Sequence, residues 1–204
     1  MSAAQRVCAI PELGSMIIEL TASSVGSDPQ ATIYSCARVN HLWFWEAMRY
    51  LWSNINWQKL RALKSMPIER RQVYAGFVKA LSLDGHPSSK YQTQILDGLL
   101  FPRVQSVNIR LWDHLTRFYL PPIQAPALRV LDLNVYKVEM TNGHILYDGS
   151  VEKRFAELCK EMFPNLQKVI LRNGTQPSAI SPAELQTFAA NFGDIEIVFV
   201  PARF

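Results

Sequence analysis

Cysteine is scarce in this chain, with only three among 204 residues. Cys8, Cys36 and Cys159 lie far apart, are odd in number, and have no spacing that suits a disulfide framework or a zinc site. Cys36 and Cys159 fall within apolar helical patterns, so we expect both to be small core side chains. This use of cysteine is typical of a reducing compartment.

Long apolar runs are also missing. No run approaches the roughly 18 residues that a membrane-spanning helix needs, and the first residues contain no apolar core of a secretory signal. We therefore expect a soluble protein of the cytoplasm, the nucleus or both, with no membrane partner.

The chain lacks every common catalytic or cofactor-binding motif. Its histidines, His41, His86, His114 and His144, are scattered, and neither H-x-x-x-H nor C-x-x-C occurs. There is no P-loop, no G-x-S-x-G nucleophile elbow and no G-x-G-x-x-G dinucleotide motif. The sequence therefore predicts neither an enzyme nor a bound cofactor or metal.

A strong excess of one charge is absent too, because 21 Lys and Arg stand against 17 Asp and Glu, a net charge of +4. The charged residues of the densest basic stretch are Arg38, Arg49, Lys59, Arg61, Lys64, Arg70 and Arg71, with Glu46 and Glu69. A solvated helical face is the first interpretation of this stretch and an acidic protein partner the second. Nucleic acid comes last, because a nucleic-acid binder usually concentrates its cations into a stripe, and we do not expect it as a partner.

Apolar residues, in contrast, make up 49% of the chain, and 12 prolines outnumber 9 glycines, so the spacing of the prolines is informative. Pro11 suits the first position of a helix, where a missing N–H costs nothing. The apolar residues that follow at i, i+3, i+4, i+7 spacing are Leu13, Met16, Ile17 and Leu20. Such a stripe predicts an amphipathic helix with one apolar face.

Two further helices are predicted before residue 53. Asp28 and Pro29 are the N-cap and first-turn signals of the second helix. The apolar positions are Ile33, Cys36, Ala37 and Val39 in the second helix, and Phe44, Ala47, Met48, Leu51 and Trp52 in the third. Trp43, Phe44 and Trp45 cannot all enter one small core, because successive helical residues lie about 100° apart. We expect something outside this unit to cover at least one of the rings.

From about residue 53 the chain predicts an α/β repeat fold. The pattern L-x-x-L-x-L, with Val or Ile allowed, occurs five times, and its middle residues step by 26, 24, 38 and 29 positions. The copies are Val78, Leu81, Leu83; Val104, Val107, Ile109; Leu128, Leu131, Leu133; Leu166, Val169, Leu171; and Ile195, Val198, Val200. This spacing is typical of leucine-rich repeats, with one long insertion. It predicts a short solenoid with a parallel sheet, whose strands lie near 78–83, 104–109, 128–133, 166–171 and 195–200.

Helical or irregular segments are expected between these strands, at 90–100, 112–120, 150–162 and 182–192, the last with Ser181 and Pro182 as cap and first turn. Three prolines, Pro102, Pro126 and Pro164, precede predicted strands by two residues. A proline there ends the preceding helix and favours extended backbone before it.

The first part of the chain resembles the F-box. That motif begins with Leu-Pro-x-x-Leu, continues as an Ile-Leu helix, and closes with Val-Cys-Arg-x-Trp and a Leu-Trp pair. The matching residues are Ile10-Pro11-Glu12-Leu13, Met16-Ile17, Leu20, Ile33, Cys36, Val39-Asn40-His41-Leu42-Trp43 and Leu51-Trp52. Asn40 replaces the usual Cys, and His41 stands where the family prefers Arg or Lys. The later segments 51–55 and 70–83, and the Phe-Pro-x-Leu introductions to strands, are similar to fungal F-box proteins with irregular leucine-rich repeats.

This resemblance implies a flexible N-terminus at 1–9, an F-box-like helical domain at 10–52 and a leucine-rich-repeat-like domain at 53–204. F-box proteins dock on the Skp-type adaptor of SCF cullin–RING ubiquitin ligases and present a protein substrate for degradation on their repeats. The residues that would meet the adaptor are Ile10, Pro11, Leu13, Ile17, Val39 and Trp43, with Trp43 as an anchor. The competing interpretation is intramolecular core for Leu13, Ile17 and Val39, and helix initiation for Pro11. A repeat scaffold without a ubiquitin-ligase role is the alternative function.

Solenoids commonly bind partners on the concave face of the sheet. The residues expected there are Ser82, Asp84, Asn108, Arg110, Asp132, Asn134, Lys168, Ile170, Arg172 and Phe199. Their mixed charge argues against a nucleic-acid groove, and an ordinary solvated sheet face is the competing interpretation.

No polar capping repeat follows the fifth predicted strand. Pro201 and Arg203 are then either a minimal block of the sheet edge, or the chain is a short or truncated member of a longer family. We expect the isolated chain to self-associate through this edge.

Overall fold

The computed structural model describes residues 6, 9–23, 29–84, 90–113, 120–137, 150–173 and 182–200. The chain divides into two compact units, Met1–Asn54 and Ile55–Phe204, which are described in turn.

The first unit contains the three predicted helices, α2 Pro11–Ser23, α3 Pro29–Cys36 and α4 His41–Leu51. The second and third end earlier than expected, because Ala37 and Val39 follow α3 and Trp52 is the C-cap of α4. Each of these helices packs against the other two. The buried apolar side chains of the unit are Ile18, Ile33, Trp43, Ala47, Met48 and Leu51. The predicted N-cap Asp28 lies outside the described residues.

The start of α4 is capped by Asn40, one of the two residues that depart from the F-box pattern. Asn40 has extended backbone, and its side-chain Oδ1 accepts a hydrogen bond of 3.0 Å from the backbone N–H of Trp43. This bond satisfies one of the four N–H groups that a helix leaves without an internal partner. Asparagine at this position therefore has a local structural role.

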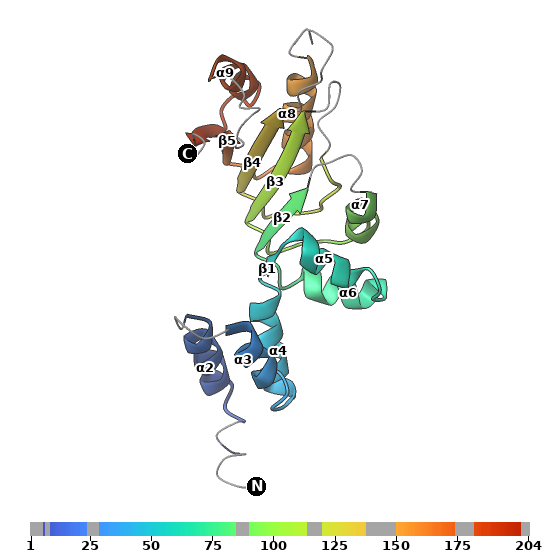
Figure 1. Ribbon diagram of the computed structural model, residues 1–204, viewed down its shortest axis with the longest axis vertical. Helices are drawn as coiled ribbons and strands as arrows, with labels where there is room; N and C mark the ends of the chain where they lie inside the picture. The colour runs from blue at the N-terminus through green and yellow to red at the C-terminus, as the bar shows by residue number, and fades with distance from the viewer. Residues whose placement is uncertain are drawn as a thin grey trace. The chain divides into compact units, whose positions relative to one another are not determined.

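The second unit is built on a six-stranded sheet whose strands follow one another in chain order. The strands are β1 Asn54–Ile55, β2 Ala80–Asp84, β3 Ser106–Asp113, β4 Val130–Lys137, β5 Lys168–Asn173 and β6 Glu196–Val200. Neighbouring strands from β2 to β6 pair in parallel, and Figure 1 shows β2, β3 and β4 running side by side in one direction. The predicted α/β class with a parallel sheet is confirmed, although each strand begins one or two residues later than its sequence pattern and β1 was not predicted.

The pairing register corrects the prediction for β6. Ile197 lies opposite Val169, and Phe199 lies opposite Leu171, so these residues continue the apolar rows of the sheet. The repeat pattern predicts Val198 and Val200 on that face and Phe199 on the other, which is wrong. The error has a physical cause: residues 197–200 are all apolar, and a strand without alternation does not reveal which face is buried.

The helices described in the second unit are α5 Trp57–Leu63, α6 Ile68–Ala75, α7 Lys90–Leu96, α8 Ser150–Met162 and α9 Pro182–Ala190. The segment predicted at 150–162 is confirmed as α8, and α7 and α9 end before their predicted limits. The prediction for 112–120 is wrong at its start, because Trp112 and Asp113 continue β3, and residues 114–119 lie outside the described part, as does Ser181. For α5 and α6 the sequence indicated only a solvated helical face without bounds.

A repeated turn stands before four of the strands. The backbone N–H groups of Val78, Val104, Leu128 and Leu166 donate to the carbonyls of Ala75, Phe101, Ala125 and Phe163, three residues earlier. Both ends of each turn are buried. Pro102, Pro126 and Pro164 occupy the second position of three turns, where a fixed φ is favourable. They therefore stand four residues before the strands and not two, as their role is to make the turn.

Apolar rows from successive strands form the core of this unit. The row Leu83, Ile109, Leu133, Leu171 is aligned by the register, and its members are no more than 1% exposed. Cys159 of α8 is also buried, as predicted, whereas the same prediction is wrong for Cys36, which is only half-buried. Stacking one repeat on the next therefore hides apolar side chains that a single repeat would expose.

The side-chain amide of Gln72 in α6 binds the backbone of Leu100 at two points. Its Nε2 donates to the Leu100 carbonyl at 2.7 Å, and its Oε1 accepts from the Leu100 N–H at 3.0 Å. Leu100 in turn forms a parallel bridge with Gln124. The Gln72 side chain therefore satisfies both backbone hydrogen-bonding groups of Leu100, as a neighbouring strand would.

We expect Gln72→Ala to lower the free energy of unfolding by about 1 kcal/mol, because two backbone groups lose a protein partner and gain only water. Urea unfolding followed by circular dichroism measures the change. Gln94→Ala is the matched control, since Gln94 is exposed on α7. Equal effects of the two substitutions would contradict the role given to Gln72.

Candidate interaction surfaces

An apolar stripe on α2 faces away from the core of its own unit. We call Leu13, Met16, Ile17 and Leu20 the outer stripe. Met16, Ile17 and Leu20 are exposed, Leu20 by 68%, and Leu13 is half-buried. The α2 residues that are buried are Gly14 and Ile18. The predicted apolar stripe is therefore present, but it does not form the core face of this helix, and for Ile17 the interpretation as intramolecular core is wrong.

Gly14 explains why α2 packs on its other face. A Cβ at this position would come within 3.2 Å of Nε1 of Trp43, so the absent side chain leaves room for the indole. Trp43 is only 7% exposed. The expectation that Trp43 is an anchor presented to a partner is corrected by this burial, because its ring is already covered within the unit.

The other two rings of the aromatic run also find contacts within their own helix. Trp45 Nε1 lies 2.8 Å from Nε2 of His41, to which it donates, and the rings of Phe44 and Trp45 meet edge to face at 5.4 Å. Both side chains are half-buried. Trp43 therefore needs no partner to cover its ring. Phe44 and Trp45 are only partly covered within the unit, and an external cover for their rings stays a prediction.

The remaining residues matched to the F-box adaptor surface are accessible. Ile10, Pro11, Ile17 and Val39 are exposed. Ile10 precedes α2 directly, and its carbonyl accepts from the Gly14 N–H at 3.3 Å, so it continues the helical spacing that joins Leu13 to Ile17. Other exposed apolar side chains of this unit, which the motif did not single out for adaptor contact, are Met16, Leu20, Tyr34 and Tyr50. The i, i+3, i+4, i+7 spacing of the outer stripe is the sequence signal that could have identified Met16 and Leu20 as part of an apolar surface.

A second surface is the polar face of the sheet, which is opposite to the buried apolar rows. Two rows that the register aligns across β2–β6 are Ser82, Asn108, Asp132, Ile170, Val198 and Asp84, Arg110, Asn134, Arg172, Val200. The substrate-face residues predicted in these rows thus do share one face, and Lys168 lies on the same face. Phe199 does not belong to it.

Several polar side chains of this face bind one another: two cations bind carboxylates, and one amide binds another amide. Arg172 Nε donates to both carboxylate oxygens of Asp132, at 2.8 and 2.9 Å. Asn134 Nδ2 donates to Asn108 Oδ1 at 3.2 Å. Lys168 Nζ lies 2.8 Å from Glu196 Oε1. Arg110 is exposed and makes no hydrogen bond or ion pair with another residue of the described ranges.

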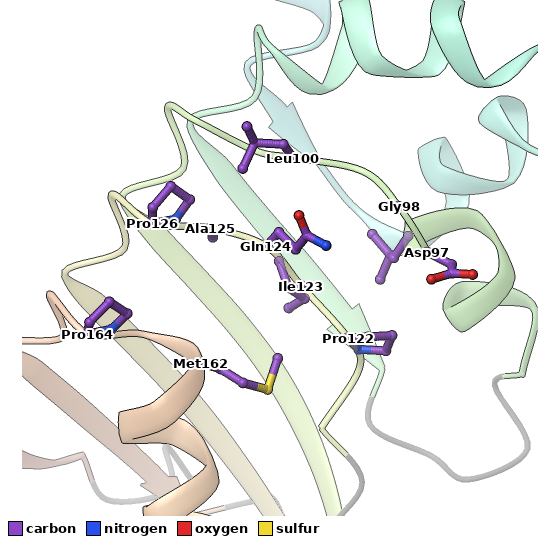
Figure 2. A pocket seen from close by; sticks show the side chains of 11 residues that line it. Asp97, Gly98, Leu100, Pro122, Ile123, Gln124, Ala125, Pro126, Met162 and Pro164 are labelled. Atoms are coloured by element: carbon purple, nitrogen blue, oxygen red, sulfur yellow. The ribbon is translucent and has the colours of Figure 1, made fainter.

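An apolar pocket of about 380 Å³ lies where three segments of the second unit meet. Figure 2 shows its walls, which come from the end of α7, from the segment before β4 and from the end of α8. Its lining residues are Leu96, Asp97, Gly98, Leu100, Pro122, Ile123, Gln124, Ala125, Pro126, Met162 and Pro164. No local sequence pattern indicates this pocket, because its walls lie far apart along the chain.

The residues that could carry metal or thiol chemistry do not gather in the described part of the chain. No group of three or more His, Cys, Asp or Glu side chains there could hold a metal ion. Cys36 is half-buried and Cys159 buried, both as free thiols, and burial raises the pKa of the Cys159 thiol. Cys8, His86, His114 and His144 lie outside the described residues.

We expect Trp43→Ala to destabilise the helical unit by about 3–5 kcal/mol, because the substitution leaves a cavity beside Gly14. Hydrogen exchange of the backbone over residues 11–51 measures the loss of protection. Trp45→Ala removes a half-buried ring and is the matched control, with a smaller expected loss. An unchanged exchange pattern in the Trp43 variant would contradict its place in the core.

The thiols should differ in reactivity at about pH 8, because the thiolate reacts and a raised pKa keeps the Cys159 thiol protonated. Cys36 is expected to be alkylated by iodoacetamide in the native protein, and Cys159 at least about a hundred-fold more slowly until the chain is unfolded in urea. Mass spectrometry of the peptides measures both rates.

The raised pKa of the Cys159 thiol also predicts how stability depends on pH. Because the thiol ionises at a lower pH in the unfolded chain than in the folded one, the free energy of unfolding should fall as the pH rises past about 8.5.

Among the described helices, none combines the length and the apolar character needed to cross a membrane. A scan against models of protein families finds none that matches the chain. No curated protein and no solved structure matches it at a significant level either. What the chain does must therefore be inferred from its own residues and surfaces.

Proposed function

We propose that this protein is an F-box-like substrate receptor of an SCF-type cullin–RING ubiquitin ligase. In this proposal the first unit, Met1–Asn54, which we call the helical unit, docks on the Skp-type adaptor, through which it is joined to a cullin scaffold. The second unit, Ile55–Phe204, which we call the repeat unit, presents a protein substrate. The protein would act by bringing proteins together, in the cytoplasm, the nucleus or both.

The exposed outer stripe of α2 is the observation that carries this proposal. A helical unit that already buries Ile18, Ile33 and Trp43 has a core of its own, and still leaves Met16, Ile17 and Leu20 in water. Covering apolar surface of this kind contributes about 25 cal/mol for each Å² removed from water. An apolar stripe on one helix face is also what a partner surface requires. The exposed Ile10 and Val39, which match the F-box, extend the apolar area of the unit.

The repeat unit supports the second half of the proposal. Its parallel strands follow one another in chain order, and a repeated turn introduces four of them, which favours a leucine-rich-repeat-like solenoid. The polar face has a cationic part at Arg110 and an apolar part at Ile170, Val198 and Val200. Such a mixed surface suits a protein substrate, with Asp84, Asn108, Asp132, Asn134, Lys168 and Arg172 arranged around it.

Co-expression with a Skp-type adaptor tests adaptor docking. We expect the wild-type chain to co-purify with the adaptor, and Ile17→Asp combined with Leu20→Asp to reduce recovery of the complex at least about ten-fold, which corresponds to about 1.4 kcal/mol. Both side chains are exposed, so the substitutions place no charge in the core. Circular dichroism of the variant checks that its helices remain.

Leu100→Asp combined with Leu158→Asp is the matched control, since both leucines are exposed in the other unit. Equal recovery of the complex with the outer-stripe variant and with this control would refute the proposed docking surface. Adaptor binding without co-purification of a cullin would instead favour a repeat scaffold that has no ubiquitin-ligase role.

A further inference from the structure

We propose that the segment formed by α5 and α6, residues 57–75, binds an acidic and partly apolar segment of another protein. The segment has five cationic side chains, Lys59, Arg61, Lys64, Arg70 and Arg71, and one carboxylate, Glu69. Its net charge of +4 equals that of the whole chain of 204 residues. Both helices belong to the repeat unit and are labelled in Figure 1.

Three of the cationic groups are held in place by their own segment. The Arg61 guanidinium lies 5.8 Å from the centre of the Trp57 ring, and that of Arg70 lies 5.9 Å from the centre of the Tyr74 ring. Arg71 Nε donates to the Met66 carbonyl at 2.8 Å. A guanidinium with a fixed position loses less freedom when it binds a carboxylate, so these contacts favour recognition of a partner.

Apolar side chains on the same helix distinguish between the possible anionic partners. Ile68 and Val73 of α6 are exposed by 42% and 44%. The phosphate backbone of a nucleic acid offers nothing for such side chains to pack against, whereas a protein segment combines carboxylates with apolar groups. The exposed pair therefore favours an acidic protein segment over a nucleic acid.

Buried side chains hold both helices in the repeat unit. Leu60 and Leu63 of α5 are fully buried, and so is Ala75 of α6, while Tyr74 is 6% exposed. Arg61 of α5, its C-cap residue Lys64 and Arg70 of α6 are exposed. Their side chains can therefore be changed without opening the core, which makes the proposal testable in the folded chain.

The test is fluorescence anisotropy with the full-length chain and a labelled synthetic peptide rich in glutamate and leucine. Arg61→Glu combined with Lys64→Glu should weaken binding of this peptide by about ten-fold or more, because two attractive contacts become repulsive. Arg103→Glu combined with Arg129→Glu changes the net charge equally at exposed sites elsewhere in the repeat unit, and should weaken it by less than about two-fold.

A second variant tests the apolar part of the site. Ile68→Ser combined with Val73→Ser should weaken binding of the glutamate–leucine peptide several-fold and leave binding of a poly-glutamate peptide unchanged. The outer-stripe variant Ile17→Asp with Leu20→Asp should bind the peptide as the wild type does, so this site and the adaptor surface can fail separately.

The following results would overturn the proposal. One is an equal loss of binding in the Arg103 and Arg129 control, which would mean that net charge alone attracts the peptide. Others are no effect of the Ile68 and Val73 variant, or tighter binding of single-stranded DNA or of phosphatidylserine vesicles than of the peptide.

Discussion

The parallel register of β2 to β5 is the constraint on which the repeat unit depends. Each strand contributes only a few apolar side chains, too few to form a core, and they form continuous buried rows only when the next strand lies in register beside it. Backbone hydrogen bonds set that register before the strands begin: Gln105 donates to Lys79, Arg129 to Gln105, and Gln167 to Arg129. The repeated turns, three of them with proline, deliver the chain to these positions. The long insertion before α8 changes the sequence spacing but not the pairing, because only the ends of each connection have to meet.

In the helical unit, the contact between Gly14 and Trp43 has the equivalent role. The missing side chain at Gly14 lets the indole lie against α2 and thereby turns the outer stripe to the solvent. A larger residue there would push the helix away from the ring. The surface that we propose for adaptor docking is thus a consequence of the internal packing, and Trp43 supports it from within without belonging to it.

Charge is distributed unevenly over the repeat unit. On the polar face, Arg172 forms an ion pair with Asp132, and Lys168 forms one with Glu196. The positive charges of these two side chains are therefore balanced by carboxylates of the same chain. The segment of α5 and α6 contains five cationic residues and a single carboxylate, and aromatic rings and a carbonyl contact three of the cationic groups. Two surfaces with the same residue types therefore differ in what they can offer to a partner.

The sequence by itself determined the places of the first three helices, of α8, and of the five later strands, because hydrophobic period, proline position and repeat spacing are local signals. For α5 and α6 it indicated only a solvated helical face without bounds, and it held no signal of the pocket. Only the tertiary structure decided which face of α2 is buried, since a stripe of period 3.6 shows that a face is apolar but not whether its own chain covers it. It also decided the register of β6, where Ile197 to Val200 carry no alternation, and the pairing of Arg172 with Asp132, which are 40 residues apart. These features depend on which segments meet in space, and a spacing along one segment holds no information on that.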